Sequence, residues 1–172
     1  MQALEALNVA LKREIDGQEY YNRAAVEAGN EKGSIFFKWL AREENGHIKL
    51  LNEAINTLTK HQSWPERKDW DSKYLSEPIS VTEFPSKPEV MGQLPAHAPE
   101  LKIFEKAIEA EKNDADFYKA LAEKVDDLEG KRMLEKLALI ERGHATALEE
   151  QYKWMKYAQD MFTVHRFNVP TC

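Results

Sequence analysis

The chain has 172 residues, of which 42% are hydrophobic, and this length suits one compact domain with a single core. It carries 24 Lys and Arg residues against 30 Asp and Glu residues, a net charge of −6, with no basic block. Nucleic acid and anionic membranes are therefore not expected partners. The one cysteine, Cys172, excludes an intrachain disulfide and any four-cysteine metal centre made by this chain alone.

No apolar run approaches the roughly 18 residues that a membrane span requires. The first residues also lack the charged and apolar regions of a signal peptide. We therefore expect a cytoplasmic protein.

Two segments with helical periodicity flank a proline-rich stretch. Over about 3–60, apolar residues recur three and four apart and are interrupted at 29–33, which predicts an αα-hairpin. Six of the seven prolines lie between 61 and 99, so this crossover cannot be one long helix, and its aromatic residues predict that it packs on the helices. A second hairpin is expected over about 100–161, turning at 126–130, before a short tail, 162–172.

The two hairpins form an internal repeat. A shift of 97 residues aligns Glu14 with Glu111 and Tyr21 with Tyr118 without a gap, and the match continues through both turns. Two repeated hairpins and a long crossover predict an all-α four-helix bundle, as one domain over 1–172. In this bundle we expect the third long helix to run parallel to the first.

Six ionisable residues occupy positions that the periodicity assigns to the core: Glu14, Glu44, His47, Glu111, Glu141 and His144. Buried carboxylates that converge repel one another until protons or cations compensate their charge. Each Glu-x-x-His pair lies on one helix face, and the repeat brings all six residues to one level. This is the ligand set of di-iron and di-manganese bundles, so we predict a dinuclear metal site. The alternative is a set of salt-bridged surface residues, with the apolar stripe misassigned by one position.

These motifs resemble the di-iron domain of the rubrerythrin family, in the ferritin-like superfamily, over about residues 3–160. The resemblance implies a ferritin-like fold and two iron ions, with manganese as an alternative. It also implies that His47 and His144 are the nitrogen ligands. Glu44 and Glu141 resemble the terminal Glu of each Glu-x-x-His. Glu14 and Glu111 would supply the carboxylates of the first and third helices.

Asp114 breaks the repeat, because Gly17 stands at the equivalent position of the first hairpin. Asp114 follows Glu111 by three residues and so points at the site. Members of the family similarly carry an additional carboxylate here, usually Glu, which exchanges with a histidine on one iron. Asp114 is therefore a candidate metal ligand, and a supporting or structural role is the alternative.

Two further repeated pairs flank the ligands. Tyr21 and Tyr118 follow their Glu by two turns, so their hydroxyls are expected to hydrogen-bond metal-bound carboxylates rather than only to fill the core. Gly46 and Gly143 indicate close helix contact beside the ligands. The remaining candidates are assigned no role in the site: His61, His97, His165, Cys172, Trp39 and Trp154.

The resemblance implies a non-haem di-iron peroxidase that reduces hydrogen peroxide to water. The tail 162–172 cannot form the four-cysteine module of full-length rubrerythrin, so the electron donor is expected to be a separate rubredoxin-like protein. A ferroxidase or iron-handling protein that uses dioxygen is one alternative, and a metal-binding helical module without turnover is another. We also expect a homodimer.

Overall fold

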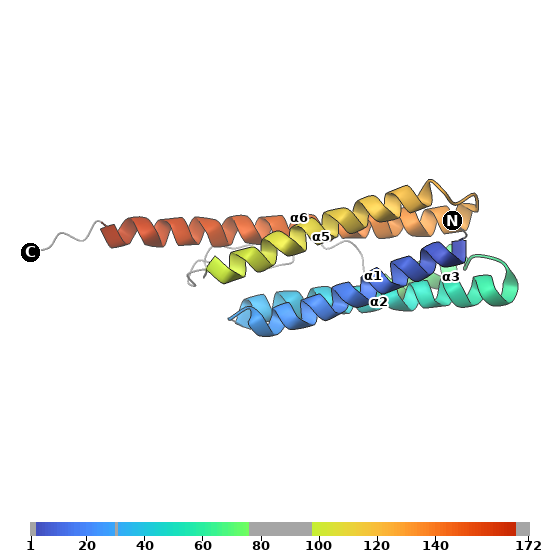
Figure 1. Ribbon diagram of the computed structural model, residues 1–172, viewed down its shortest axis with the longest axis horizontal. Coiled ribbons are helices and arrows are strands. Elements are labelled where there is room, and N and C mark those ends of the chain that lie inside the picture. Colours follow the sequence, from blue (N-terminus) through green and yellow to red (C-terminus); the bar gives the residue numbers. More distant parts are fainter. Residues whose placement is uncertain (1–2, 30, 76–97, 168–172) are drawn as a thin grey trace, which may run out of the picture.

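The computed structural model describes residues 3–29, 31–75 and 98–167, and these parts are dominated by long helices (Figure 1). The helices are α1 (Ala3–Glu27), α2 (Glu31–His61), α3 (Arg67–Tyr74), α5 (Ala98–Ala122) and α6 (Leu128–Phe167). The four long helices confirm the predicted all-α bundle. The short helix α3 lies in the expected crossover, and α6 continues past the boundary expected at 161.

Each hairpin closes where the sequence predicts a turn. Gly29, with φ of 65°, takes the left-handed conformation that commonly ends a helix, and α2 begins two residues later. At the second turn the Asp127 Oδ1 accepts a hydrogen bond from the backbone N–H of Gly130 at 2.9 Å, which caps the first turn of α6. The pairs α1–α2 and α5–α6 therefore pack closely as two hairpins.

Helix α5 runs antiparallel to α1, so the parallel direction expected from the sequence is wrong (Figure 1). The contacts between them reverse the residue order: Tyr21 pairs with Glu111, and Tyr118 pairs with Glu14. The reason lies in the crossover. Helix α2 ends at the end of the bundle where α1 begins, and α5 begins at the other end, so α5 is parallel to α2 instead.

This antiparallel arrangement relates the two hairpins by an approximate two-fold axis. A shift of 97 residues turns the contact between Tyr21 and Glu111 into the contact between Tyr118 and Glu14, and the reverse. Such an exchange of contacts is the mark of a two-fold interface. The axis passes through the middle of the bundle, where the six repeated ionisable residues lie.

Two apolar clusters flank this region. One contains Leu7, Leu50 and Leu137, and it includes Trp64 and Trp70 from the start of the crossover. The other, toward the first turn, contains Phe36, Phe37, Leu40, Phe104 and Leu148. Trp70 is only 1% exposed, which confirms that this part of the crossover packs on the bundle; residues 76–97 of the expected crossover lie outside the described residues.

Candidate metal centre

The six repeated ionisable residues are buried in the middle of the bundle. Their exposed fractions range from 1% to 4% in the set Glu14, Glu44, His47, Glu111, Glu141 and His144. The alternative of salt-bridged surface residues is therefore wrong. Because isolated buried charges are unfavourable, these groups must compensate one another with protons or share a cation.

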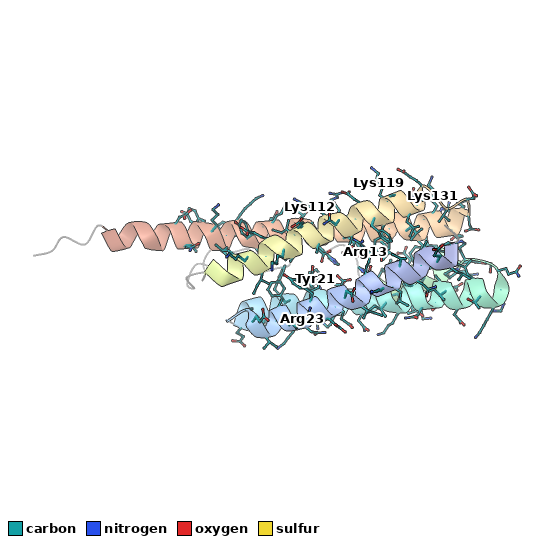
Figure 2. The ribbon with its side chains drawn as sticks, viewed as in Figure 1. Arg13, Tyr21, Arg23, Lys112, Lys119 and Lys131 are labelled. Atoms are coloured by element: carbon teal, nitrogen blue, oxygen red, sulfur yellow. The ribbon has the colours of Figure 1, made fainter. Side chains whose placement is uncertain are left out.

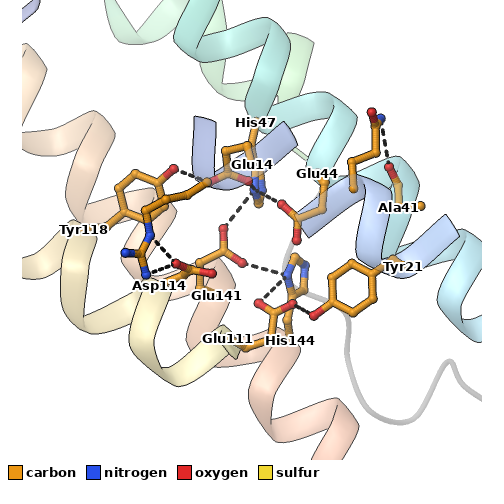
Figure 3. A network of polar contacts seen from close by, with 12 residues as sticks. Glu14, Tyr21, Ala41, Glu44, His47, Glu111, Asp114, Tyr118, Glu141 and His144 are labelled. Carbon is orange, nitrogen blue, oxygen red and sulfur yellow. Dashed lines mark hydrogen bonds and ion pairs between the residues drawn. The ribbon is translucent and has the colours of Figure 1, made fainter. Parts of the chain in front are cut away.

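Each of the four long helices contributes to this polar cluster, as Figure 3 shows. Glu14 comes from α1 and Glu111 from α5, while α2 and α6 each contribute a Glu and a His three residues apart, on one helix face. Gly17 on α1 faces Glu44: a Cβ on Gly17 would lie 3.7 Å from the Glu44 carboxyl carbon, in ordinary van der Waals contact.

Two overlapping groups of ligand atoms form inside the cluster. The first is Glu14, Glu44, His47 and Glu141, and the second is Glu44, Glu111, Glu141 and His144; within each group the ligand atoms lie within 4.8 Å of one another. We call these the His47 set and the His144 set. Each set takes three side chains from one hairpin and one from the other. Glu44 and Glu141 belong to both sets, so each could be shared between two ions, whereas the resemblance implied terminal positions for them.

The imidazoles lie between the carboxylates. The His47 Nδ1 is 2.9 Å from Glu141, 3.1 Å from Glu14 and 3.3 Å from Glu44. The His144 Nδ1 is 2.9 Å from Glu141 and 3.5 Å from Glu111. The two rings stack with centroids 5.8 Å apart, so both histidines face one compact centre.

Burial and mutual charge shift the pKa values in this cluster. Burial and the neighbouring carboxylates raise the pKa of Glu44 well above its usual range, and burial and Glu141 raise that of Glu111 to about 8. For His144, burial opposes the charge, but contacts with Glu111 and Glu141 outweigh it and raise the pKa to about 10. Glu141 behaves oppositely: burial opposes its ionisation, but His47 and His144 outweigh it and lower the pKa well below 4.5. Without metal, protons therefore compensate the carboxylates.

The donor chemistry of the cluster suits two divalent cations. Two buried carboxylate oxygens, Glu111 Oε2 and Glu141 Oε1, accept no hydrogen bond from the described residues, although Glu141 Oε1 lies close to His47 without hydrogen-bond alignment. Oxygen-rich sites with two imidazoles suit iron or manganese, whereas sulfur ligands are absent from this cluster. The residues present therefore fit a dinuclear iron or manganese centre.

Two tyrosines bond to the cluster across the two hairpins. The hydroxyl of Tyr21 on α1 donates to Glu111 on α5, and that of Tyr118 on α5 donates to Glu14 on α1. Burial first, and then the nearby carboxylates, raise the pKa of both phenols well above 10. The hydroxyls therefore stay protonated and serve as hydrogen-bond donors. Each tyrosine holds the carboxylate of the opposite hairpin rather than that of its own helix.

Asp114 lies at the edge of the cluster and belongs to neither ligand set. Its Oδ1 accepts a hydrogen bond at 2.5 Å from the Nε of Arg13, on α1. Arg13 was not identified from the sequence. One signal was available, because the repeat places Ala110 at the position equivalent to Arg13, so Arg13 departs from the repeat as Asp114 does. The ring of Trp39, which was assigned no role in the site, packs edge-on against that of His144, with centroids 5.4 Å apart.

The two repeated glycines differ in their surroundings. A Cβ on Gly46 would come 2.3 Å from the backbone oxygen of Tyr74, at the end of α3, so close contact is confirmed there. Among the described residues nothing lies within 4 Å of a Cβ on Gly143, so the close contact expected on the second hairpin is not found there. Helix α3 packs against α2 and α6, and it is α2 that it approaches at the glycine. His61, which was given no role, is exposed at the end of α2.

A family model described as Rubrerythrin matches residues 5–89 and 102–170, which is most of the chain. The chain belongs to the rubrerythrin family. Searches of curated proteins and of solved structures gave no significant match. Rubrerythrin membership agrees with the all-α bundle and with the buried carboxylate and histidine cluster. Among the described residues, no helix combines the length and apolar character needed to span a bilayer.

Proposed function

We propose that this rubrerythrin-family chain is a non-haem di-iron oxidoreductase that reduces hydrogen peroxide to water. The observation that carries the proposal is the pair of overlapping ligand sets, each with one histidine and three carboxylates, that share Glu44 and Glu141. When bound, two iron ions would supply the two electrons that one peroxide molecule needs, together with two protons, to become two water molecules. The His47 set and the His144 set would each hold one ion.

The protein's own residues prepare this centre in two ways. The apolar clusters on either side exclude water and strengthen every electrostatic contact between them. The hydroxyls of Tyr21 and Tyr118 hold Glu111 and Glu14 in place, and hydrogen bonds of this kind orient metal-ligating carboxylates.

Electrons would come from a rubredoxin-like donor, whose four-cysteine iron site the one cysteine of these 172 residues cannot form. We further propose that the protein is a homodimer, which sedimentation would test, and that it is cytoplasmic, which cell fractionation would test.

The deciding experiment loads the protein with Fe(II) without oxygen and follows its oxidation by stopped-flow absorbance. We expect two iron ions per chain and much faster oxidation by hydrogen peroxide than by dioxygen. Peroxide consumption should also be sustained when a rubredoxin and its reductase are supplied. Equal or faster oxidation by dioxygen would favour a ferroxidase instead, and two bound ions that neither oxidant changes would favour a metal-binding module without turnover.

A further inference from the structure

Arg13 on α1 and Asp114 on α5 form an ion pair at the edge of the metal-ligand cluster. Among the described residues, it is the one ion pair there that joins these two helices. The guanidinium also lies over the ring of Phe117, 4.5 Å from its centroid, which fixes its orientation. The side chains of Arg13 and Asp114 are 37% and 28% exposed, whereas those of the cluster carboxylates are almost completely buried. This pair therefore stands between solvent and the cluster.

Asp114 is close to the cluster without being part of it. It lies one turn after Glu111 on α5, and the antiparallel packing brings this turn toward Glu14 on α1. Burial, followed by the charges of Glu141 and Glu14, raises the pKa of Asp114 to about 6 against the opposing effect of Arg13. Both of these glutamates belong to the His47 set. Asp114 is thus a spare carboxylate beside one of the two proposed metal positions.

The two-fold relation between the hairpins makes this pair informative. Shifting Arg13 by 97 residues gives Ala110, and shifting Asp114 back by 97 gives Gly17, so the opposite half of the centre has no equivalent pair. The glutamate, histidine and tyrosine positions all obey the repeat. The ion pair is consequently a local difference between two otherwise similar metal positions.

We propose that Arg13 is a positioning residue that holds the Asp114 carboxylate at the edge of the cluster and so keeps an additional ligand away from the metal position of the His47 set. The inference rests on the proposed dinuclear centre. Arg13 is the only cation that the described residues place against Asp114. Without Arg13, the Asp114 carboxylate would be unpaired beside Glu14 and Glu141, and a divalent cation would then stabilise its negative charge.

The test uses Co(II) as the probe, without oxygen, on the full-length protein. Two binding constants are measured by titration, and the visible absorption of Co(II) reports its coordination. We expect Arg13→Ala to tighten one of the two constants by about tenfold, leave the other unchanged, and alter the Co(II) spectrum. Arg13→Gln, which keeps more of the side-chain packing, should act in the same direction, so the result does not depend on one variant folding well.

The double variant Arg13→Ala/Asp114→Asn separates this role from a general charge effect. If Arg13 acts through Asp114, the tighter constant and the spectral change both disappear in the double variant. Lys112→Ala is the matched control, because Lys112 is next to Glu111 but its side chain is 45% exposed. Its Nζ forms an ion pair, 2.5 Å long, with Glu149 on α6. Figure 2 labels both basic residues. The control should leave both constants and the spectrum unchanged.

Two results would overturn the proposal. Either the gain in affinity survives the loss of Asp114, which would make it a simple effect of removing a positive charge, or the Arg13 variants bind two Co(II) ions as the parent protein does. In both cases the dinuclear centre itself stands. A parent protein that binds fewer than two Co(II) ions would instead remove the proposed function, and this inference with it.

Discussion

Tyr118 on α5 donates its hydroxyl hydrogen to Glu14 on α1, although the two residues are 104 positions apart in the chain. The contact joins the two hairpins at the level of the metal-ligand cluster, and the two-fold relation repeats it between Tyr21 and Glu111. The sequence alone placed each tyrosine near a carboxylate, but the antiparallel direction of α5 decides which one.

The first prediction concerns these hydroxyls. Tyr118→Phe leaves a buried carboxylate without its donor, so we expect it to cost about 1–3 kcal/mol of unfolding free energy in the metal-free protein and about tenfold or more in metal affinity. Tyr21→Phe should have effects of similar size because it is the equivalent residue. Thermal unfolding and metal titration measure both. Tyr157→Phe is the control, because Tyr157 is 59% exposed, and a control that loses as much affinity would contradict the assignment.

The second prediction separates shared from unshared carboxylates. Glu44 and Glu141 belong to both ligand sets, so Glu44→Ala and Glu141→Ala should each lower the metal content from two ions per chain toward zero. Glu14 and Glu111 belong to one set each, so their alanine variants should retain about one ion. Elemental analysis after Fe(II) or Mn(II) loading distinguishes the two patterns. Equal losses in all four variants would count against bridging by Glu44 and Glu141.

The third prediction is a pH dependence of the metal-free protein. Burial and Glu141 raise the pKa of Glu111 from 4.5 to about 8 in the folded protein. Between these two pH values the unfolded chain loses the Glu111 proton more readily than the folded protein does, so the free energy of unfolding decreases as the pH rises from 4.5 to 8. The pKa of His144 is raised from 6.5 to about 10, and its contribution to stability is present below 6.5 and lost as the pH rises through 10. The unfolding temperature of the metal-free protein, measured with a chelator present, should therefore decrease as the pH rises from 6 to 9.

A matched variant tests the source of this slope. Glu111→Gln keeps the shape of the side chain but cannot ionise, so the metal-free variant should lose less stability than the parent between pH 6 and 8, while its metal binding is impaired. Saturating Mn(II) should oppose the trend in the parent protein, because metal binding displaces the protons. A midpoint that is independent of pH in the metal-free parent would show that these residues are not compensated by protons.

The fourth prediction compares the two repeated glycines. Gly46→Ala would place a Cβ against the Tyr74 backbone oxygen and displace α3, so we expect a loss of about 1–3 kcal/mol. At Gly143→Ala no described residue lies against the new Cβ, so we expect a gain of about 1 kcal/mol from helix propensity. Each kcal/mol moves the unfolding midpoint by roughly 2–4 °C in a domain of this size, which calorimetry resolves. Equal effects would contradict the difference in their surroundings.

Much of this centre could be predicted because the repeat provides two copies of one pattern. A single Glu-x-x-His carries little information, but Glu44 and His47 recur as Glu141 and His144 at the same spacing, and all four are buried as predicted. Periodicity located the helices for a similar reason, since the apolar stripe of each helix must face the core.

The remaining features depend on contacts between distant segments. Periodicity does not contain helix direction, so nothing in the pattern around Tyr118 showed that its partner is Glu14 rather than Glu111. The different surroundings of Gly46 and Gly143 arise from α3, which packs beside only one of them. Likewise, the position of Asp114 one turn after Glu111 could be read from the sequence, but Arg13, which approaches from another helix, decides what it contacts.

Each ligand set combines three side chains from one hairpin with one from the other, and this division has a consequence for folding. A bound ion would work as a reversible cross-link between halves of the chain that are joined covalently only through the crossover. Like a disulfide, it would restrict the separation of these halves, but a chelator or acid would release it. The metal content would then set how far the two hairpins unfold as one cooperative unit, and hydrogen exchange along α1 and α5 would follow the supply of iron.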